Sequence, residues 1–235
     1  MSELLALSRV SKSYRRGPEE IHALRDVTLV LRPGELVGLV GPSGSGKSTL
    51  LMVAAGWERP DEGAVSWHGE GGAPGGAPWS AIALVPQRLG LVDELTVAEN
   101  VAMPLRLAGG ASSEIDLRTD ELLAPLDLAP LAQRRPSETS LGEQQRTAMA
   151  RALALRPALL LADEPTGHQD ARREVLVLRA LQDLIVAGSC CLLATHNPAA
   201  LAVCSRVVVM ADGAIVEERG GEANLDLLLW GRDPR

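Results

Sequence analysis

One short motif decides which architectures are open to this chain. It reads Gly41-Pro42-Ser43-Gly44-Ser45-Gly46-Lys47-Ser48-Thr49 and matches the pattern G-x-x-x-x-G-K-[ST] at every fixed position. An apolar strand is predicted before it, from Glu35 to Val40, and a helix after it, from about Lys47 to a stop near Gly56. A strand, a glycine-rich loop and a helix together form a phosphate-binding site. The motif therefore predicts an α/β core that binds a phosphorylated ligand.

The residue types in this motif have separate chemical uses. The glycines allow the backbone to wrap around an anion with its N–H groups pointing inward. Lys47 is placed to neutralise the β- and γ-phosphates of a nucleotide, and the Ser48 hydroxyl can bind Mg²⁺. The alternative is a chance Gly/Ser loop, which the flanking strand and helix disfavour. All nine residues, 41–49, are candidate nucleotide contacts.

A second candidate site follows the buried strand predicted at Ala158 to Ala162. Asp163 and Glu164 are adjacent carboxylates at its carboxyl end, where open α/β sheets bind their ligands. Asp163 could hold Mg²⁺ through water, and Glu164 could orient and polarise an attacking water. An acidic turn without a chemical role is the alternative for such a pair alone. The phosphate loop favours the functional interpretation.

His196 follows another predicted core strand, Cys190 to Ala194. A lone histidine is more often structural than catalytic, but this one lies 33 residues after Asp163 at a strand end. Because parallel strands end at the same edge of a sheet, His196 could reach a γ-phosphate.

Strands and helices alternate along most of the remaining chain. Strands are predicted at 4–10, 27–31 and 206–210, with a hairpin turning on Asp212-Gly213. A helix before Gly188 is predicted to bury one face, formed by Val175, Leu178, Leu181 and Ile185. Residues 69–78 hold five Gly and two Pro, which predicts a flexible loop.

The middle of the chain has a different pattern. From about Thr96 to Leu155 it reads as helical with no good strand, and capping boxes are predicted at Thr96/Glu99 and Ser140/Glu143. We expect residues 93–155 to form a helical lobe inserted in the α/β core of a single domain, 1–235.

Composition excludes several classes of protein. Apolar residues make up 46% of the chain, enough for a large core, and the formal net charge of −7 argues against a nucleic-acid binder. Three Cys in 235 residues do not suggest a disulfide framework, and Cys190 and Cys191 are expected to be core thiols. No apolar stretch approaches the roughly 18–20 residues that span a bilayer. Any work at a membrane would therefore need a membrane-bound partner.

Together these motifs resemble the nucleotide-binding domain of ABC transporters, over nearly all 235 residues. The loop 41–49, Asp163-Glu164-Pro165 and Thr195-His196-Asn197 resemble the Walker A, Walker B and switch-histidine motifs. The resemblance implies a RecA-like P-loop NTPase core with an antiparallel β subdomain and an inserted helical lobe. It also implies ATP and Mg²⁺ as ligands, Tyr14 as the aromatic residue that stacks on adenine, Gln87 as the lid-loop residue sensing Mg²⁺ and water, and Asp170 as the D-loop aspartate.

The segment Thr139-Ser140-Leu141-Gly142-Glu143 departs from the family's usual LSGGQ or LSGGE. Ser140 and Gly142 match, and the resemblance implies that they contact the γ-phosphate bound by the opposite subunit. Leu141 adds bulk where glycine allows close approach, and it disfavours a positive φ. Ser140 could also be a simple helix cap. Gln169 similarly replaces the leucine usual in the D-loop.

The resemblance implies an ATP-hydrolysing subunit that pairs with a second ATP-binding subunit and with a separate membrane permease, on the cytoplasmic face of the cell membrane. Leu91–Gly109 and Arg134–Arg146 resemble the lipoprotein-release and macrolide-export group. Leu141 and Gln169 leave one alternative open, an ATP-dependent regulatory module with attenuated hydrolysis. A soluble ABC ATPase of DNA repair or translation and a small-molecule P-loop kinase fit the sequence less well.

Overall fold

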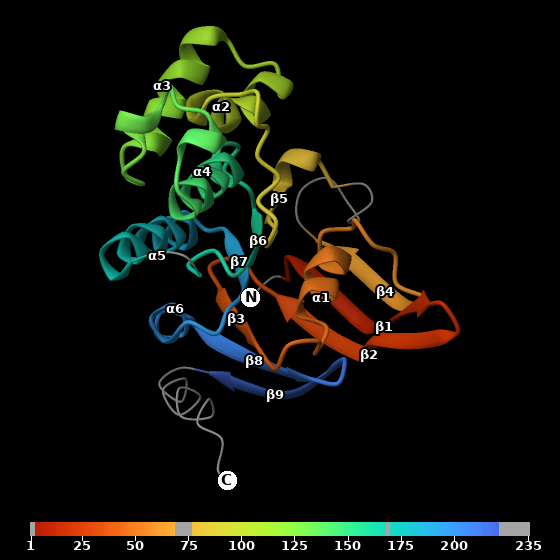
Figure 1. Cartoon of the computed structure of the whole chain (residues 1–235). Helices are drawn as coiled ribbons and strands as arrows, with labels where there is room; N and C mark the ends of the chain where they lie inside the picture. The colour runs from red at the N-terminus through yellow and green to blue at the C-terminus, as the bar shows by residue number, and fades with distance from the viewer. Residues whose placement is uncertain (1–2, 69–76, 168–169, 221–235) are drawn as a thin grey trace.

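A computed structural model describes residues 3–68, 77–167 and 170–220 of the chain. Its central feature is a mostly parallel sheet (Figure 1). In spatial order, its strands are β5 (Ile82–Val85), β6 (Leu159–Asp163), β7 (Cys190–Ala194), β3 (Leu36–Val40), β8 (Arg206–Ala211) and β9 (Ala214–Gly220). Only the pairing of β8 with β9 is antiparallel. The short apolar runs predicted at 35–40, 158–162, 190–194 and 206–210 are confirmed as strands of this sheet.

A second, antiparallel sheet lies beside the first and has the order β2-β1-β4. Its strands are β1 (Leu5–Arg16), β2 (Glu19–Leu31) and β4 (Glu62–Trp67). The strands predicted at 4–10 and 27–31 are the inner ends of the long β1–β2 hairpin. β4 was not predicted, because its exposed half, Glu62-Gly63-Ala64, lacks a regular apolar alternation.

Helix α1 (Lys47–Ala54) lies between the two sheets and buries Leu50 and Leu51. It follows the loop that leaves β3, as the motif predicts, and Gly56 comes just after its end with φ +74°. Residues of β7 alternate between two hydrophobic cores. Cys190 and Leu192 face α1 and the antiparallel sheet, whereas Cys191 and Leu193 face the helices on the other side.

Between β5 and β6 the chain forms helices, and no strand occurs anywhere in residues 93–155, all of which are described. The segment contains α2 (Val97–Leu107), α3 (Ser112–Leu123), the 3₁₀ turns η2 (Ala129–Leu131) and η3 (Pro136–Glu138), and α4 (Leu141–Leu153); another 3₁₀ turn, η1 (Trp79–Ala81), precedes β5. Figure 1 shows α2, α3 and α4 grouped at one end of the molecule. Both predicted capping boxes form, at Thr96/Glu99 and at Ser140/Glu143.

Helix α5 (Ala171–Val186) covers the sheet near β7 and β3, and the short α6 (Pro198–Ala202) follows β7. The predicted buried face of α5 is partly wrong, because Val175 is 42% exposed. Val177, Leu178, Leu181 and Leu184 form the buried stripe instead, so the face is rotated from the one predicted. Gly188 follows the helix with φ +95°. The β8–β9 hairpin turns at Asp212 and Gly213, both with positive φ, as Asp-Gly turns require.

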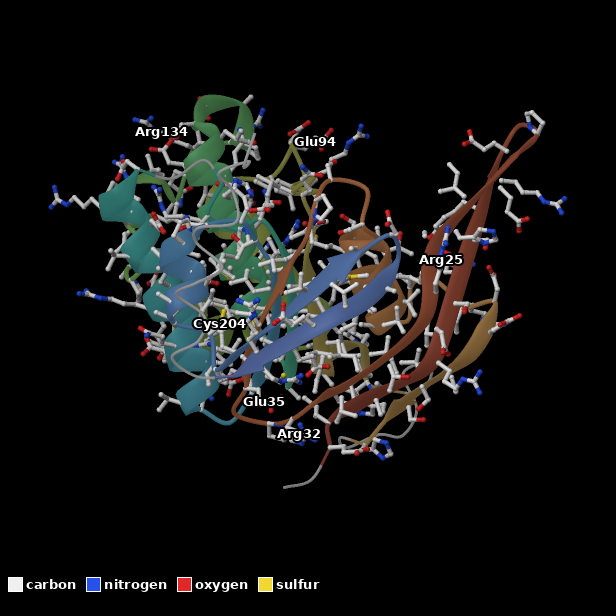
Figure 2. The ribbon with its side chains drawn as sticks, turned by 90° about the horizontal axis from the view of Figure 1, so that it is seen from below. Arg25, Arg32, Glu35, Glu94, Arg134 and Cys204 are labelled. Atoms are coloured by element: carbon white, nitrogen blue, oxygen red, sulfur yellow. The ribbon has the colours of Figure 1, made fainter. Side chains whose placement is uncertain are left out.

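An ion-pair cluster holds the turn between β2 and β3. The turn lies at the amino end of β3, away from the carboxyl ends of the parallel strands. Glu35 accepts from the Arg206 guanidinium at 3.1 Å and lies 3.6 Å from Arg32. Figure 2 shows Arg32 and Glu35 close together at this turn. The cluster ties β3, which leads into the phosphate-loop motif, to β8.

All three cysteines are buried and none forms a disulfide, as expected for core thiols. Burial raises the pKa of Cys190 to about 12, so this thiol stays protonated at neutral pH. Of the flexible loop predicted at 69–78, residues 69–76 lie outside the described residues, as does Gln169. No helix among the described residues is both long and apolar enough to cross a bilayer.

Candidate functional site

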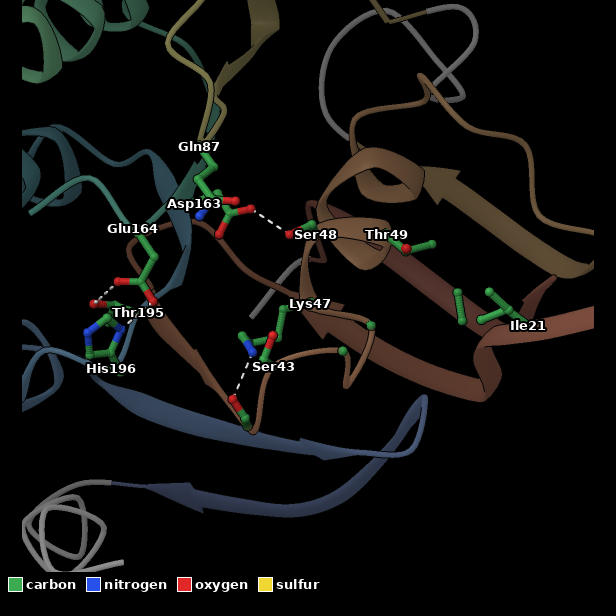
Figure 3. A pocket seen from close by; sticks show the side chains of 14 residues that line it. Ile21, Ser43, Lys47, Ser48, Thr49, Gln87, Asp163, Glu164, Thr195 and His196 are labelled. Carbon is green, nitrogen blue, oxygen red and sulfur yellow. Dashed lines mark hydrogen bonds and ion pairs between the residues drawn. The ribbon is translucent and has the colours of Figure 1, made fainter. Parts of the chain in front are cut away.

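A cavity of about 470 Å³ lies at the carboxyl ends of β3, β6 and β7. Figure 3 shows its side chains, which come from segments far apart in the sequence. The lining residues that the sequence predicted are Gly41, Ser43, Gly44, Gly46, Lys47, Ser48, Thr49, Gln87, Asp163, Glu164 and His196. The phosphate loop, the strand-end carboxylates, the lid-loop glutamine and the histidine therefore meet in one place.

The loop between β3 and α1 keeps a shape that only glycine allows. Gly41, Gly44 and Gly46 all have φ between +82° and +152°. A Cβ on Gly46 would overlap the Ala23 carbonyl oxygen of β2. Ser45 is buried and its backbone carbonyl accepts from Gly213 N at 3.2 Å, so the β8–β9 turn supports the loop from outside.

The N-terminus of α1 favours binding of an anion. Its N-cap, Gly46, provides no side-chain acceptor, and no acidic residue lies in the first turn. The first N–H groups of a helix have no partner within the helix and carry its positive dipole end. Lys47 adds a full charge to this end, and its Nζ donates to the carbonyls of Gly41 at 2.7 Å and Pro42 at 2.9 Å. The arrangement concentrates positive potential at the mouth of the loop.

Ser48 and Asp163 bring two oxygen donors together on one side of the cavity. Ser48 Oγ donates to Asp163 Oδ2 at 2.6 Å, and Gln87, two residues beyond the end of β5, lines the same cavity. A hydroxyl, a carboxylate and an amide oxygen are hard ligands suited to Mg²⁺. Because Mg²⁺ is usually bound through one or two carboxylates and completes its shell with waters and substrate phosphates, a single carboxylate beside a hydroxyl and an amide fits the ion.

Glu164 and His196 form a close pair on the other side of the cavity. Glu164 Oε1 lies 2.7 Å from His196 Nδ1, and Thr195 Oγ1 donates to Glu164 Oε2 at 3.3 Å. The Glu164 side chain is 22% exposed, whereas that of His196 is 86% exposed. The carboxylate is therefore sheltered, and the imidazole extends from it toward solvent.

The backbone of Glu164 is unusual, because its φ is +53°, a conformation that non-glycine residues rarely adopt. Three hydrogen bonds hold it. Its N–H donates to Ala194 O at 2.8 Å, and its carbonyl accepts from Gly167 N at 3.2 Å and from Gln145 Nε2 at 3.4 Å. Such conformations persist where surrounding contacts enforce them, often at functional sites. Here the turn directs the carboxylate toward His196.

Six predicted site residues lie outside the cavity lining: Pro42 and Ser45 within the phosphate loop, and Tyr14, Ser140, Gly142 and Asp170 elsewhere in the chain. Tyr14 is on β1, 37% exposed, opposite Ile21 in the antiparallel pairing. Asp170 caps α5 by accepting from Arg173 N at 2.9 Å, and this hydrogen bond lowers the pKa of its carboxyl group. Ser140 caps α4, with Glu143 N donating to its Oγ at 3.3 Å, and Gly142 lies in the first turn of that helix. The capping role considered for Ser140 is therefore observed.

Leu141 does not adopt the positive φ that a leucine disfavours. Leu141 is the first residue of α4 and is absent from the residues with positive φ among those described. Its side chain is 47% exposed, so the extra bulk lies at the surface.

Three lining residues were not predicted from the sequence: Ile21, Ala23 and Thr195. Thr195 precedes His196, so its position after β7 was an available signal. Ile21 and Ala23 carry no chemical signature. Only the pairing of β2 with β1 and its position beside the loop bring them to the cavity.

Comparison with known proteins agrees with this geometry. The family described as ABC transporter matches residues 24–167, a range that contains the phosphate loop and the Asp163-Glu164 pair. The chain belongs to the ABC transporter family. It is the ATP-binding and ATP-hydrolysing subunit of an ABC transporter. The alternative, a regulatory module with attenuated hydrolysis, is not favoured.

Relatives of the lipoprotein-release and macrolide-export group are among the most similar curated proteins. The lipoprotein-releasing system ATP-binding protein LolD 2 of Caulobacter vibrioides is 41% identical over 223 residues, covering 92% of this chain and 98% of its own length. The macrolide export ATP-binding/permease protein MacB of Chromobacterium violaceum is 38% identical over 225 residues, covering 93% of this chain but 35% of its own length. The predicted subgroup is thereby confirmed.

A solved structure supports the fold. The dimeric post-hydrolysis state of the ATP-binding cassette MJ0796, bound to ADP and Pi, superposes with a TM-score of 0.86 at 33% identity, covering 92% of this chain and 98% of that one. The predicted class, a P-loop NTPase core with an antiparallel sheet, is therefore confirmed.

Proposed function

We propose that this chain hydrolyses Mg-ATP in the cavity around Lys47 and uses the energy to drive a membrane permease. The observation that carries the proposal is that two pairs line one cavity with Lys47: Ser48–Asp163 at 2.6 Å and Glu164–His196 at 2.7 Å. One pair suits a metal, and the other suits an attacking water. Catalysis of phosphoryl transfer is mostly positioning and electrostatics, which this arrangement supplies.

Loop 41–49 would hold the triphosphate through its N–H groups, with Lys47 on the β- and γ-phosphates. Ser48 and Asp163, with Gln87 nearby, would hold Mg²⁺, which when bound neutralises the phosphate oxygens. Tyr14 would stack on adenine, beside Ile21 at the edge of the cavity.

Glu164 would orient and polarise the attacking water, and His196 would contact the γ-phosphate while holding Glu164 in place. The sheltered carboxylate can accept a hydrogen bond from water, and the exposed imidazole can reach a bound phosphate. The Thr195 hydroxyl bonds the second Glu164 oxygen and restricts its rotation.

A second ATP-binding subunit, a copy of this chain or a relative, would complete the site. Ser140 and Gly142 lie at the start of α4, outside the cavity of their own chain, where a helix N-terminus could meet a phosphate held by another protomer. Asp170 would lie at the same interface. The dimeric cassette MJ0796 supports this assembly.

The permease would be an integral-membrane partner that holds this chain at the cytoplasmic face of the cell membrane. The names of the LolD and MacB relatives support a role in lipoprotein release or export. We further propose that residues 1–235 form one ABC ATP-binding domain in which 93–155 is an inserted helical lobe. Nucleic acid is not an expected partner of this acidic chain.

The test is to compare Glu164→Gln with the unchanged chain, in the presence of its permease. We expect ATP turnover to fall by about 10²- to 10⁴-fold, as for loss of a general base, while Mg-ATP binding persists. Glu114→Gln is the matched control, because Glu114 is an exposed carboxylate in the first turn of α3 and should leave turnover unchanged. Turnover that is equal in Glu164→Gln and the unchanged chain would refute the proposal.

A further inference from the structure

Lys12 makes a contact that the proposed mechanism does not use. Its Nζ lies 5.6 Å from the centroid of the Tyr14 ring, within the roughly 6 Å over which a cation is attracted to an aromatic face. Lys12 and Tyr14 are two residues apart on β1, so their side chains emerge on the same face of the sheet. Tyr14 is the only Tyr in the chain.

The ammonium is held in place by the loop that follows α1. It donates to Arg59 O at 2.8 Å and to Asp61 Oδ1 at 3.1 Å, and it lies 3.7 Å from Glu58 Oε2. The hydrogen bond that the ammonium donates to Asp61 raises the pKa of Lys12, which keeps the ammonium charged at neutral pH. Only 13% of the Lys12 side chain is exposed.

The Asp61 carboxylate is itself held by β1. Its second oxygen accepts a hydrogen bond at 2.7 Å from the backbone N–H of Ser13, which lies between Lys12 and Tyr14. The three side chains therefore form a short chain of contacts, from Asp61 through the ammonium to the ring. The ring remains accessible, since Tyr14 is 37% exposed, and it lies opposite Ile21 at the edge of the nucleotide cavity.

We propose that Lys12 is a positioning residue for the nucleotide base: clamped by Asp61 and Arg59, it holds the Tyr14 ring ready to stack on adenine. The inference rests on the proposed function, in which Tyr14 receives the base. A ring fixed before binding loses less side-chain freedom when the base arrives. The cation also draws electron density from the ring face, which favours stacking on an electron-rich purine.

The experiment compares Mg-ATP with magnesium tripolyphosphate, which has the phosphates but no base. For Lys12→Met we expect ATP binding about threefold to tenfold weaker and tripolyphosphate binding unchanged, because ordering one side chain has an effect of this size. The KM for ATP should rise with kcat unchanged. Lys12→Arg keeps a cation over the ring and should restore most of the ATP affinity.

Two further variants separate the possible failures. Arg9→Met is the matched control, since Arg9 is also a cation on β1 paired with a carboxylate, Asp26 at 3.0 Å, and should bind ATP normally. In a Tyr14→Ala background, Lys12→Met should have no additional effect on ATP affinity.

The outcomes then differ for each claim. If the unchanged chain does not bind Mg-ATP, the proposed function fails. If Tyr14→Ala binds ATP normally, stacking on Tyr14 fails, and the role of Lys12 fails with it. If Tyr14→Ala weakens ATP binding but Lys12→Met does not, only the positioning role is overturned. Equal losses of ATP and tripolyphosphate in Lys12→Met would also overturn it, by indicating a general structural defect.

Discussion

At the scale of single residues, Ser48 and Asp163 are separated by 115 positions, yet their side chains form a 2.6 Å hydrogen bond. The contact arises because Ser48 lies in the first turn of α1, just after β3, and Asp163 ends β6, with β7 between the two strands. Strand ends that share one edge of a parallel sheet place such side chains together. The meeting of these two oxygens is the basis for the proposed Mg²⁺ site.

Removing the Ser48 hydroxyl should weaken this site selectively. For Ser48→Ala we expect the Mg²⁺ concentration for half-maximal ATP hydrolysis to rise by at least about tenfold, since one hard oxygen ligand is lost. Titration of ATPase activity with Mg²⁺ measures it. Ser48→Thr keeps a hydroxyl and should stay near the original value. An unchanged Mg²⁺ requirement in Ser48→Ala would argue against metal binding by Ser48.

Prediction of the site from sequence succeeded where residue chemistry and position at a strand end coincide. Lys47, Asp163 and His196 each follow a recognisable apolar run, and all three reach the cavity. Ile21 and Ala23 could not be predicted, because their place depends on the register of β2 against β1. The positive φ of Glu164 likewise depends on tertiary hydrogen bonds and leaves no mark in a sequence.

At the scale of elements, the loop between β3 and α1 depends on glycine for two separable reasons. Gly44 and Gly46 both have positive φ, but a Cβ on Gly44 meets open space, whereas one on Gly46 would overlap the Ala23 carbonyl. We expect Gly44→Ala to lower the free energy of unfolding by about 1 kcal/mol through backbone strain alone. Gly46→Ala should lower it by at least about 3 kcal/mol, because the loop must also move.

Urea denaturation of both glycine variants measures these losses, and ATP binding by Gly46→Ala should be lost with the loop geometry. Equal destabilisation by the two substitutions would contradict the account, since it would mean that contact with β2 does not restrict the loop.

The cap of α2 makes stability depend on pH. Thr96 N donates to Glu99 Oε2 at 2.8 Å, and this hydrogen bond, followed by that from the Thr96 side chain, lowers the pKa of Glu99 in the folded state. A lowered folded-state pKa gives stability that is present above the unfolded pKa and lost as pH falls through the folded value. The unchanged chain should therefore lose stability on acidification partly through Glu99.

In Glu99→Gln, the free energy of unfolding should fall less steeply than in the unchanged chain as the pH is lowered from about 5 to about 3. Urea unfolding midpoints across that interval measure the slope. Glu114→Gln is the control, because the N-cap of α3 makes no side-chain hydrogen bond. The same slope in Glu99→Gln and in the unchanged chain would show that the cap does not contribute to acid sensitivity.

Helices and strands were predicted accurately where the local pattern of apolar residues is clear. Core strands such as β6 and β7 were predicted almost to the residue, because buried parallel strands read as short apolar runs. β4 was missed because half of it is exposed. The face of α5 was misplaced at Val175, because helical periodicity tolerates more than one apolar stripe and only packing against the sheet selects between them.

At the scale of the whole molecule, the cavity exists only in the folded chain, since its walls come from β2, the phosphate loop, the loop after β5 and the ends of β6 and β7. Ser140 and Gly142 lie outside it. This division is expected of a site that a second protomer completes. From the sequence, the roles of Ser140 and Gly142 could be assigned only by resemblance, because the pattern of a single chain does not indicate which residues contact a second protomer.

The most direct test of the central claim is equilibrium binding of Mg-ATP to the purified chain and to Lys47→Ala, measured by dialysis with labelled ATP. The account predicts saturable binding of one ATP by the unchanged chain. It predicts about tenfold to hundredfold weaker binding by Lys47→Ala, because charged hydrogen bonds to phosphate are lost. An unchanged chain that does not bind Mg-ATP, or a Lys47→Ala variant that binds it equally well, would contradict the account.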